Sequence, residues 1–310
     1  MNNPFVALKE NSELALADND HFSTAGHWWS RPEIDALILA HAARRPLLVR
    51  GEAGSGKSQI ARAAAQAMGS VPLLVEVIHP RFEALDLLYR MDAVERLADA
   101  QMQRLDESNE KYVKRGRLWD AIALVHIDKN PPVLLIDEID KADADVPNAL
   151  LDVLGNRSFS VPALKHRTIR AEGGRMPLMI ITTNEERELP AAVVRRCVVL
   201  NVNPPAEEAL FIAWLVERSR VHRHLIIDDA ARQLAAQQVL ADRKAAIAQG
   251  YPKVGLAEYI DLLTALHELT QGMPTKARGA EQIVKIQQLS AYALVKNADQ
   301  LQQRKPEQPT

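Results

Sequence analysis

A glycine-rich segment ending in a lysine and a serine is the first stretch whose residue types could do chemistry. It reads GEAGSGKS and lies between the apolar residues 47–49 and an alanine-rich helical pattern over 59–68. Its three glycines let the backbone turn sharply and point N–H groups inward, as a phosphate-binding loop before a helix requires. Lys57 would reach the β- and γ-phosphates of a nucleotide, and the Ser58 hydroxyl would bind Mg²⁺. A glycine-rich turn could match by chance, but the flanking strand and helix favour the loop. The expected nucleotide contacts are Gly51, Glu52, Ala53, Gly54, Ser55, Gly56, Lys57, Ser58 and Gln59.

Polar side chains follow two further apolar runs. Asp137 and Glu138 come directly after the buried-type run 133–136, so their carboxylates are expected where parallel sheets bind ligands, at the carboxyl end of a strand. Asp137 suits a Mg²⁺ contact and Glu138 suits the polarisation of an attacking water. An acidic helix cap is the alternative. Asn184 follows the run 178–181 and could orient that water, or it could simply begin a turn.

The elements that would position these residues form an α/β pattern up to a break at residues 203–205. Continuous apolar runs predict buried parallel strands at 47–49, 73–78, 133–136, 178–181 and 198–202. Between them, helices are expected after a serine cap at Ser30, over 84–105, over 118–127, over 146–154 with a stop at Gly155, and over 190–196. A short hairpin is expected over 158–170.

Beyond Pro205 the pattern predicts helices only, near residues 207–219, 228–249, 256–272 and 280–295. We therefore divide the chain into an N-terminal arm (1–30), a nucleotide-binding core (31–203), a helical lid (204–300) and a polar tail (301–310). Trp28 and Trp29 precede the first helix. Core packing is the favoured interpretation for this pair, although a tryptophan there could touch adenine.

Composition and charge narrow the classes of function. The net charge of −2 gives no global field toward nucleic acid or anionic lipid, although a local basic patch is possible. No apolar run approaches the roughly 20 residues of a bilayer helix, and the N-terminus lacks the pattern of a signal peptide. The single cysteine, Cys197, agrees with a reducing compartment. We expect a cytoplasmic protein without a membrane segment. His222 and His224 lack a third ligand at metal spacing, which favours a solvated turn.

With these residues in view, the chain resembles the AAA+ ATPases and, within them, the MoxR-like group of the bacterial cytoplasm. GEAGSGKS is similar to Walker A, VLLIDEID at 133–140 to Walker B, TTN at 182–184 to the end of the sensor 1 strand, and LPAAVVRRC at 189–197 to the arginine-finger helix. The MoxR-like resemblance is carried by RLW at 117–119, DEIDKAD at 137–143 and VPNALLDVL at 146–154.

The resemblance implies an α/β fold, namely an AAA+ P-loop NTPase αβα core with a five-stranded parallel sheet, followed by an all-helical lid domain from about Pro204. It also implies ATP and Mg²⁺ as cofactors and a homo-oligomeric, commonly hexameric, ring with nucleotide between subunits. Arg196 would be the finger that reaches the neighbouring subunit's nucleotide, with Arg195 as the alternative. Arg278 would be the sensor 2 residue of the lid, with Lys276 as the second choice.

Three functions remain open. The first is an Mg-ATP-hydrolysing ring that remodels or activates a protein client, which the MoxR-like resemblance suggests carries a von Willebrand A domain. The second is a motor subunit acting on nucleic acid, which would need a basic, aromatic pore loop such as residues 81–83 or 112–115. The third is an ATP-gated scaffold of a regulatory or defence complex with negligible turnover, against which the intact Glu138 argues.

Overall fold

A five-stranded parallel sheet is the centre of the computed structural model, which describes residues 3–18, 22, 25–126 and 129–293. The strands lie in the order β11, β3, β10, β7, β4. Their bounds are β3 Leu47–Arg50, β4 Leu73–Val77, β7 Val133–Asp137, β10 Leu178–Thr183 and β11 Val198–Asn201. These are the five predicted strands. Both faces of the sheet are covered, which is why the strands read as continuous apolar runs.

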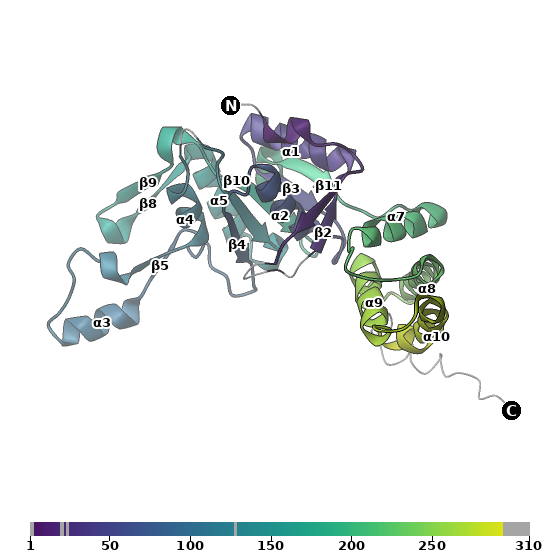
Figure 1. Cartoon of the computed structure of the whole chain (residues 1–310). Helices are drawn as coiled ribbons and strands as arrows, with labels where there is room; N and C mark the ends of the chain where they lie inside the picture. The colour runs from purple at the N-terminus through teal and green to yellow at the C-terminus, as the bar shows by residue number, and fades with distance from the viewer. Residues whose placement is uncertain (1–2, 19–21, 23–24, 127–128, 294–310) are drawn as a thin grey trace.

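Helices on both faces make the core a three-layer αβα sandwich (Figure 1). On one face, α1 (Arg31–Ala43) and α2 (Lys57–Ala67) pack on strand residues such as Val49 and Leu135. On the other face, α4 (Arg117–Ala123), α5 (Asp145–Asn156) and α6 (Ala191–Arg196) pack on the alternate residues, such as Leu48 and Ile136. The predicted α/β core is therefore confirmed.

In the core, two helix ends differ from the prediction. Helix α4 ends at Ala123 rather than near residue 127. Helix α5 continues through Gly155, and the left-handed residue that closes it is Arg157, with φ of 51°. The predicted stop was Gly155, because glycine adopts the left-handed conformation without steric cost.

The segment expected to be an N-terminal arm packs on the core. A 3-10 turn, η1 (Pro4–Ala7), buries Phe5 completely, and β1 (Glu13–Leu16) pairs antiparallel with β2 (Ala25–Trp28). Strands of four residues are too short to show a clear period. After them, Trp29 is buried in the core, and the predicted cap of α1 is present because the Ser30 N–H donates to Glu33 Oε2 at 2.9 Å.

The predicted long helix over residues 84–105 is wrong. The chain instead forms β5 (Tyr89–Met91), helix α3 (Ala93–Gln101), η2 (Glu110–Tyr112) and β6 (Val113–Arg115), which pairs with β5. Leu87 and Leu88 are buried in the core, whereas Val94 and Leu97 of α3 are exposed. Sequence spacing could not distinguish these two environments. The resulting insertion projects away from the sheet at the lower left of Figure 1.

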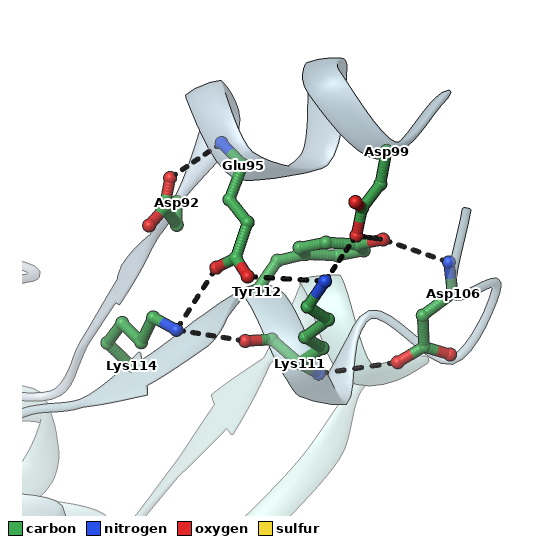
Figure 2. Close-up of polar contacts among 7 residues, drawn as sticks. All are labelled: Asp92, Glu95, Asp99, Asp106, Lys111, Tyr112 and Lys114. Carbon is green, nitrogen blue, oxygen red and sulfur yellow. Dashed lines mark hydrogen bonds and ion pairs between the residues drawn. The ribbon is translucent and has the colours of Figure 1, made fainter. Parts of the chain in front are cut away.

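Polar contacts hold α3 against η2, as Figure 2 shows. Asp99 accepts hydrogen bonds from Lys111 Nζ at 2.5 Å and from the Tyr112 hydroxyl at 2.9 Å. Glu95 accepts one from Lys114 Nζ at 3.2 Å. Helix α3 buries none of its own residues, so these contacts replace apolar packing on its inner side.

The rest of the core consists of short elements. The predicted hairpin is formed by β8 (Ser158–Val161) and β9 (Arg167–Arg170). Three further 3-10 turns are η3 (Ile139–Lys141), η4 (Pro162–Leu164) and η5 (Glu172–Gly174).

Four helices after β11 form the helical lid, which has its own apolar core. They are α7 (Glu208–Arg220), α8 (Asp229–Ala248), α9 (Leu256–Leu269) and α10 (Thr275–Ala293). The lid lies on the side of the sheet away from the insertion (Figure 1). None of the helices in the described ranges combines the length and the apolar character needed to cross a membrane.

Candidate nucleotide site

The predicted phosphate-binding loop joins β3 to α2 and also meets the lid. Gly56 caps the start of α2 in the left-handed region, with φ of 89°, and Gly54 has φ of 71°. A Cβ atom on Gly54 would lie only 2.7 Å from the Cβ atom of Ala257 in α9. Glycine is therefore required there both by the backbone conformation and by the close approach of the lid.

Lys57 is held at the mouth of this loop. Its Nζ donates to the Gly51 carbonyl at 2.9 Å, to the Glu52 carbonyl at 2.7 Å and to Asn184 Oδ1 at 2.7 Å. Burial lowers the pKa of Lys57, while the carboxylates of Asp137 and Asp140 oppose that shift. All three ammonium donors are engaged. A phosphate oxygen would replace one of these acceptors.

Ser58, Asp137 and Thr182 form a connected oxygen cluster. Ser58 Oγ donates to both Asp137 carboxylate oxygens at 2.9 Å, and the Thr182 hydroxyl donates to Asp137 Oδ1 at 2.5 Å. Hard oxygen ligands of this kind fit Mg²⁺. Among the described residues no group of three or more His, Cys, Asp or Glu side chains could hold a metal ion. Mg²⁺ would therefore be bound here by few protein oxygens, with phosphate and water oxygens completing its shell.

Glu138 occupies a strained backbone position, with φ of 59° and ψ of 47°. Its N–H donates to Thr182 Oγ1 at 2.9 Å, which holds that conformation. Its carboxylate accepts from Asn184 Nδ2 at 3.3 Å through Oε1 and from Lys141 Nζ at 2.6 Å through Oε2. Left-handed geometry in a residue other than glycine is often found at functional sites. Here it presents the carboxylate beside Asn184.

Asn184 links the two halves of the site. Its carbonyl oxygen faces the Lys57 cation and its amide group faces the Glu138 carboxylate, so charge fixes the orientation of the side chain. Its backbone N–H donates to Asp140, which is buried and also accepts from the Glu186 N–H at 2.9 Å. Sequence reasoning did not single out Asp140 or Thr182. The signal was present, because Asp140 ends the motif at 133–140 and Thr182 begins the motif at 182–184.

Two adjoining cavities surround the loop. One, of about 310 Å³, is lined by the loop, Asp137, Glu138, Thr182 and Asn184. The other, of about 210 Å³, lies between β2, the loop, α7 and α9. Both are lined by Gly54, Gly56 and Gln59. Trp28 lines the second cavity, whereas its neighbour Trp29 is buried in the core, as the favoured interpretation of the pair predicts for Trp29.

Glu52 connects the loop to the lid. Its carboxylate receives two hydrogen bonds from Arg243 Nη2, at 2.6 and 2.8 Å, and one from Lys253 Nζ at 2.9 Å. Burial opposes ionisation, but the hydrogen bonds from Lys253 and Arg243 prevail and lower the pKa of Glu52. The side chain of Glu52 therefore contacts the lid, and only its main chain faces Lys57. These two lid cations were missed by sequence reasoning.

Arg278, the expected sensor 2 residue, is not brought to the loop. Its Nη2 donates to the Met273 carbonyl at 2.8 Å, in the turn that follows α9. Helix α9 meets the loop at its first residues and is 14 residues long, so its far end lies about 20 Å away. The side chain of Lys276, the second choice, lies outside the described residues.

Arg195 and Arg196 end α6, are exposed, and line neither cavity at the loop. They face different ends of the sheet. Arg195 lines a cavity with Arg50 and Glu185, near the carboxyl ends of strands. Arg196 lines one with Pro46 and Leu178, near the amino ends.

Comparison with known proteins places a family domain on the core. Residues 46–197 match the family model described as AAA domain, dynein-related subfamily. No curated protein matches the sequence significantly.

Solved structures that resemble the chain include the RuvB Holliday junction branch migration motor of Thermotoga maritima. It is 15% identical with a TM-score of 0.44, and the match covers 83% of this chain and 66% of that one. A mutant of that RuvB is 14% identical with a TM-score of 0.47, over 84% and 68% of the two chains. NtrX from Brucella abortus is 18% identical with a TM-score of 0.44, over 77% and 50%. At these sequence identities and TM-scores, the structural similarities give no information about the function of this chain.

Proposed function

Taking residues 46–197 as an AAA domain, we propose that the chain is a Mg-ATP-hydrolysing subunit of a hexameric ring that remodels or activates a protein client. The observation that supports hydrolysis is one continuous set of contacts. It runs from Lys57 through Asn184 to Glu138, and Thr182 joins it to Asp137 and Ser58. Phosphate-binding, metal-binding and water-activating groups thus share one cavity.

Each side chain has a role in this proposal. The loop and Lys57 bind the β- and γ-phosphates, while Trp28 and Gln59 border the space for the base. Ser58 and Asp137 hold Mg²⁺, which supplies charge neutralisation on the phosphates. Glu138 polarises the attacking water, and Asn184 fixes the position of the Glu138 carboxylate.

The arginines of α6 support action between subunits. Because Arg195 and Arg196 line no cavity at their own phosphate loop, either would serve a nucleotide only when a neighbouring chain presents one. We keep Arg196 as the finger and Arg195 as the alternative. An arginine supplied by a partner can raise phosphoryl-transfer rates by about 10³ to 10⁵.

The insertion supports a protein client over a nucleic acid. Helix α3 exposes Val94 at 81% and Leu97 at 61%, which suits contact with protein. Phe82 and Tyr112, the rings of the two candidate pore loops, are 4% and 0% exposed and therefore unavailable for stacking on bases. The MoxR-like resemblance adds a client with a von Willebrand A domain to the proposal.

Mixing two inactive variants tests this function. Glu138→Gln chains lack the water-activating carboxylate and Arg196→Ala chains lack the finger, so mixed rings should regain part of the ATPase activity at interfaces that pair an intact Glu138 with an intact Arg196. A mixture with Arg195→Ala in place of Arg196→Ala is the matched control. If size measurements show mixed rings and neither mixture regains ATPase activity, the proposal that an arginine of one subunit acts on its neighbour's nucleotide is wrong. Copurification from the native host with mass spectrometry would identify the client.

A further inference from the structure

An arginine-lined cavity lies at the edge of the sheet opposite the phosphate loop. Its volume is about 630 Å³, twice that of the cavity at the loop, and falls in the range of small-molecule sites. The ends of α1, α5 and α6 border it, together with Pro46 and Leu178 at the starts of two strands. Its described lining includes no carboxylate but five arginines: Arg44, Arg45, Arg157, Arg175 and Arg196.

Four of these five charges have no partner in the part of the chain that the structure describes. Arg44, Arg45, Arg157 and Arg196 make no ion pair and no side-chain hydrogen bond with a described residue. The fifth, Arg175, has partners, among them the backbone carbonyls of residues 126 and 129, to which it donates at 3.3 Å.

Helix capping explains part of this arrangement, because cations are favoured at helix C-termini. Three helices, α1, α5 and α6, end at the cavity, and each contributes about −0.5 elementary charge. Their sum of about −1.5 leaves most of the charge on Arg44, Arg45, Arg157 and Arg196 uncompensated. Arg44 and Arg157 also adopt left-handed backbone conformations, with φ of 53° and 51°, where glycine or asparagine would be less strained.

The positive potential acts on a neighbouring group. His41 lines the same cavity, and its pKa is lowered first by burial and then by the charges of Arg175 and Arg44.

We propose that this arginine cavity binds a polyphosphate group, at a site separate from the chain's own phosphate loop. Guanidinium groups form paired hydrogen bonds to phosphate oxygens, and several of them in one concavity match a ligand with several charges in a small volume. The polyphosphate has two sources, a free anion or the nucleotide held by a neighbouring copy of the chain. The second source rests on the proposed ring, in which Arg196 is already the finger.

Titration of inorganic tripolyphosphate into the full-length Lys57→Ala chain tests the free source. Calorimetry is performed at a dilution where light scattering shows monomers, so that neither the phosphate loop nor a neighbour supplies the site. We expect binding, and we expect Arg44→Ser with Arg157→Ser to weaken it by at least about tenfold per arginine. The matched control removes two exposed arginines elsewhere, Arg104→Ser with Arg170→Ser, and should keep the affinity.

Assembled rings test the other source. If the monomer does not bind tripolyphosphate, Arg44→Ser with Arg157→Ser should lower ATP turnover in rings. Turnover should then recover when these chains are mixed with Glu138→Gln chains. The Arg104→Ser with Arg170→Ser control should keep full turnover. The proposal is overturned if binding survives the cavity substitutions, or if the monomer does not bind and the cavity substitutions leave turnover at the control level. An inactive wild-type chain would refute the ATPase function, but the monomer titration would still decide on the cavity.

Discussion

The hydroxyl of Thr182 should matter to both stability and catalysis. Thr182 is 0% exposed; it accepts a hydrogen bond from the Glu138 N–H and donates one to Asp137 Oδ1. Thr182→Val keeps the shape of the side chain and removes the hydroxyl. The variant leaves a buried N–H without its acceptor and deprives the Asp137 carboxylate of a donor, at the point where the backbone of Glu138 is strained.

The expected loss of stability in Thr182→Val follows from these two hydrogen bonds. A hydrogen bond to a charged group contributes about 1.5 to 3 kcal/mol, and an unsatisfied buried group costs about 1 to 3 kcal/mol. Since local relaxation recovers part of this, we expect a loss of about 2 to 4 kcal/mol in the free energy of unfolding. Because Thr182 orients a proposed metal ligand, turnover at limiting Mg²⁺ should fall by about 10- to 100-fold.

Thr183→Val is the matched control on the same strand. Thr183 is also buried, and its hydroxyl accepts a hydrogen bond from the Glu185 N–H at 3.0 Å, away from Asp137 and Glu138. Its loss should cost about 1 kcal/mol in stability and leave the Mg²⁺ dependence of turnover unchanged. Urea unfolding and ATPase assays over a Mg²⁺ series measure both quantities. Equal Mg²⁺ dependence in the two variants, both folded, would refute the role given to Thr182.

Three further predictions concern other parts of the chain. Glu138→Gln should bind ATP and hardly hydrolyse it, because an amide cannot polarise water as a carboxylate does; turnover assays and labelled-ATP binding check this. Glu52→Gln should raise the KM for ATP and the protease sensitivity of the lid, since Arg243 and Lys253 lose their carboxylate partner. Burial lowers the pKa of His27 from 6.5 to about 4, so the folded state disfavours the protonated imidazole. The free energy of unfolding is therefore unaffected above pH about 6.5, and it falls by up to about 3 kcal/mol as the pH is lowered through 4. In urea unfolding at several pH values, His27→Gln should remove part of this loss and leave the part due to His222, whose pKa is also lowered to about 4.

The sequence predicted those parts of the fold whose patterns are local. Strands covered on both faces read as apolar runs, and the polar residues after them meet because parallel strands share a carboxyl edge. This reasoning placed Lys57, Asp137 and Asn184 together, as the structure does. Their catalytic roles remain predictions.

Contacts between distant segments could not be predicted in this way. Glu52 meets Arg243 across 191 residues, and no period or motif relates the two positions. The expectation for Arg278 relied on its place at the start of a helix, but the turn before that helix lies at the far end of the lid from the loop. The break between Leu88 and Val94 was hidden because a buried and an exposed apolar residue look alike in sequence.

Equilibrium binding of labelled ATP to the wild-type and Lys57→Ala chains tests the central claim most directly. The loop offers one buried cation to the phosphates, and its three hydrogen bonds hold it at the mouth of the cavity. The wild-type chain should bind Mg-ATP, and the folded variant should lose detectable affinity. Unchanged affinity in a Lys57→Ala chain with normal thermal unfolding would contradict the assignment of this loop as the phosphate site.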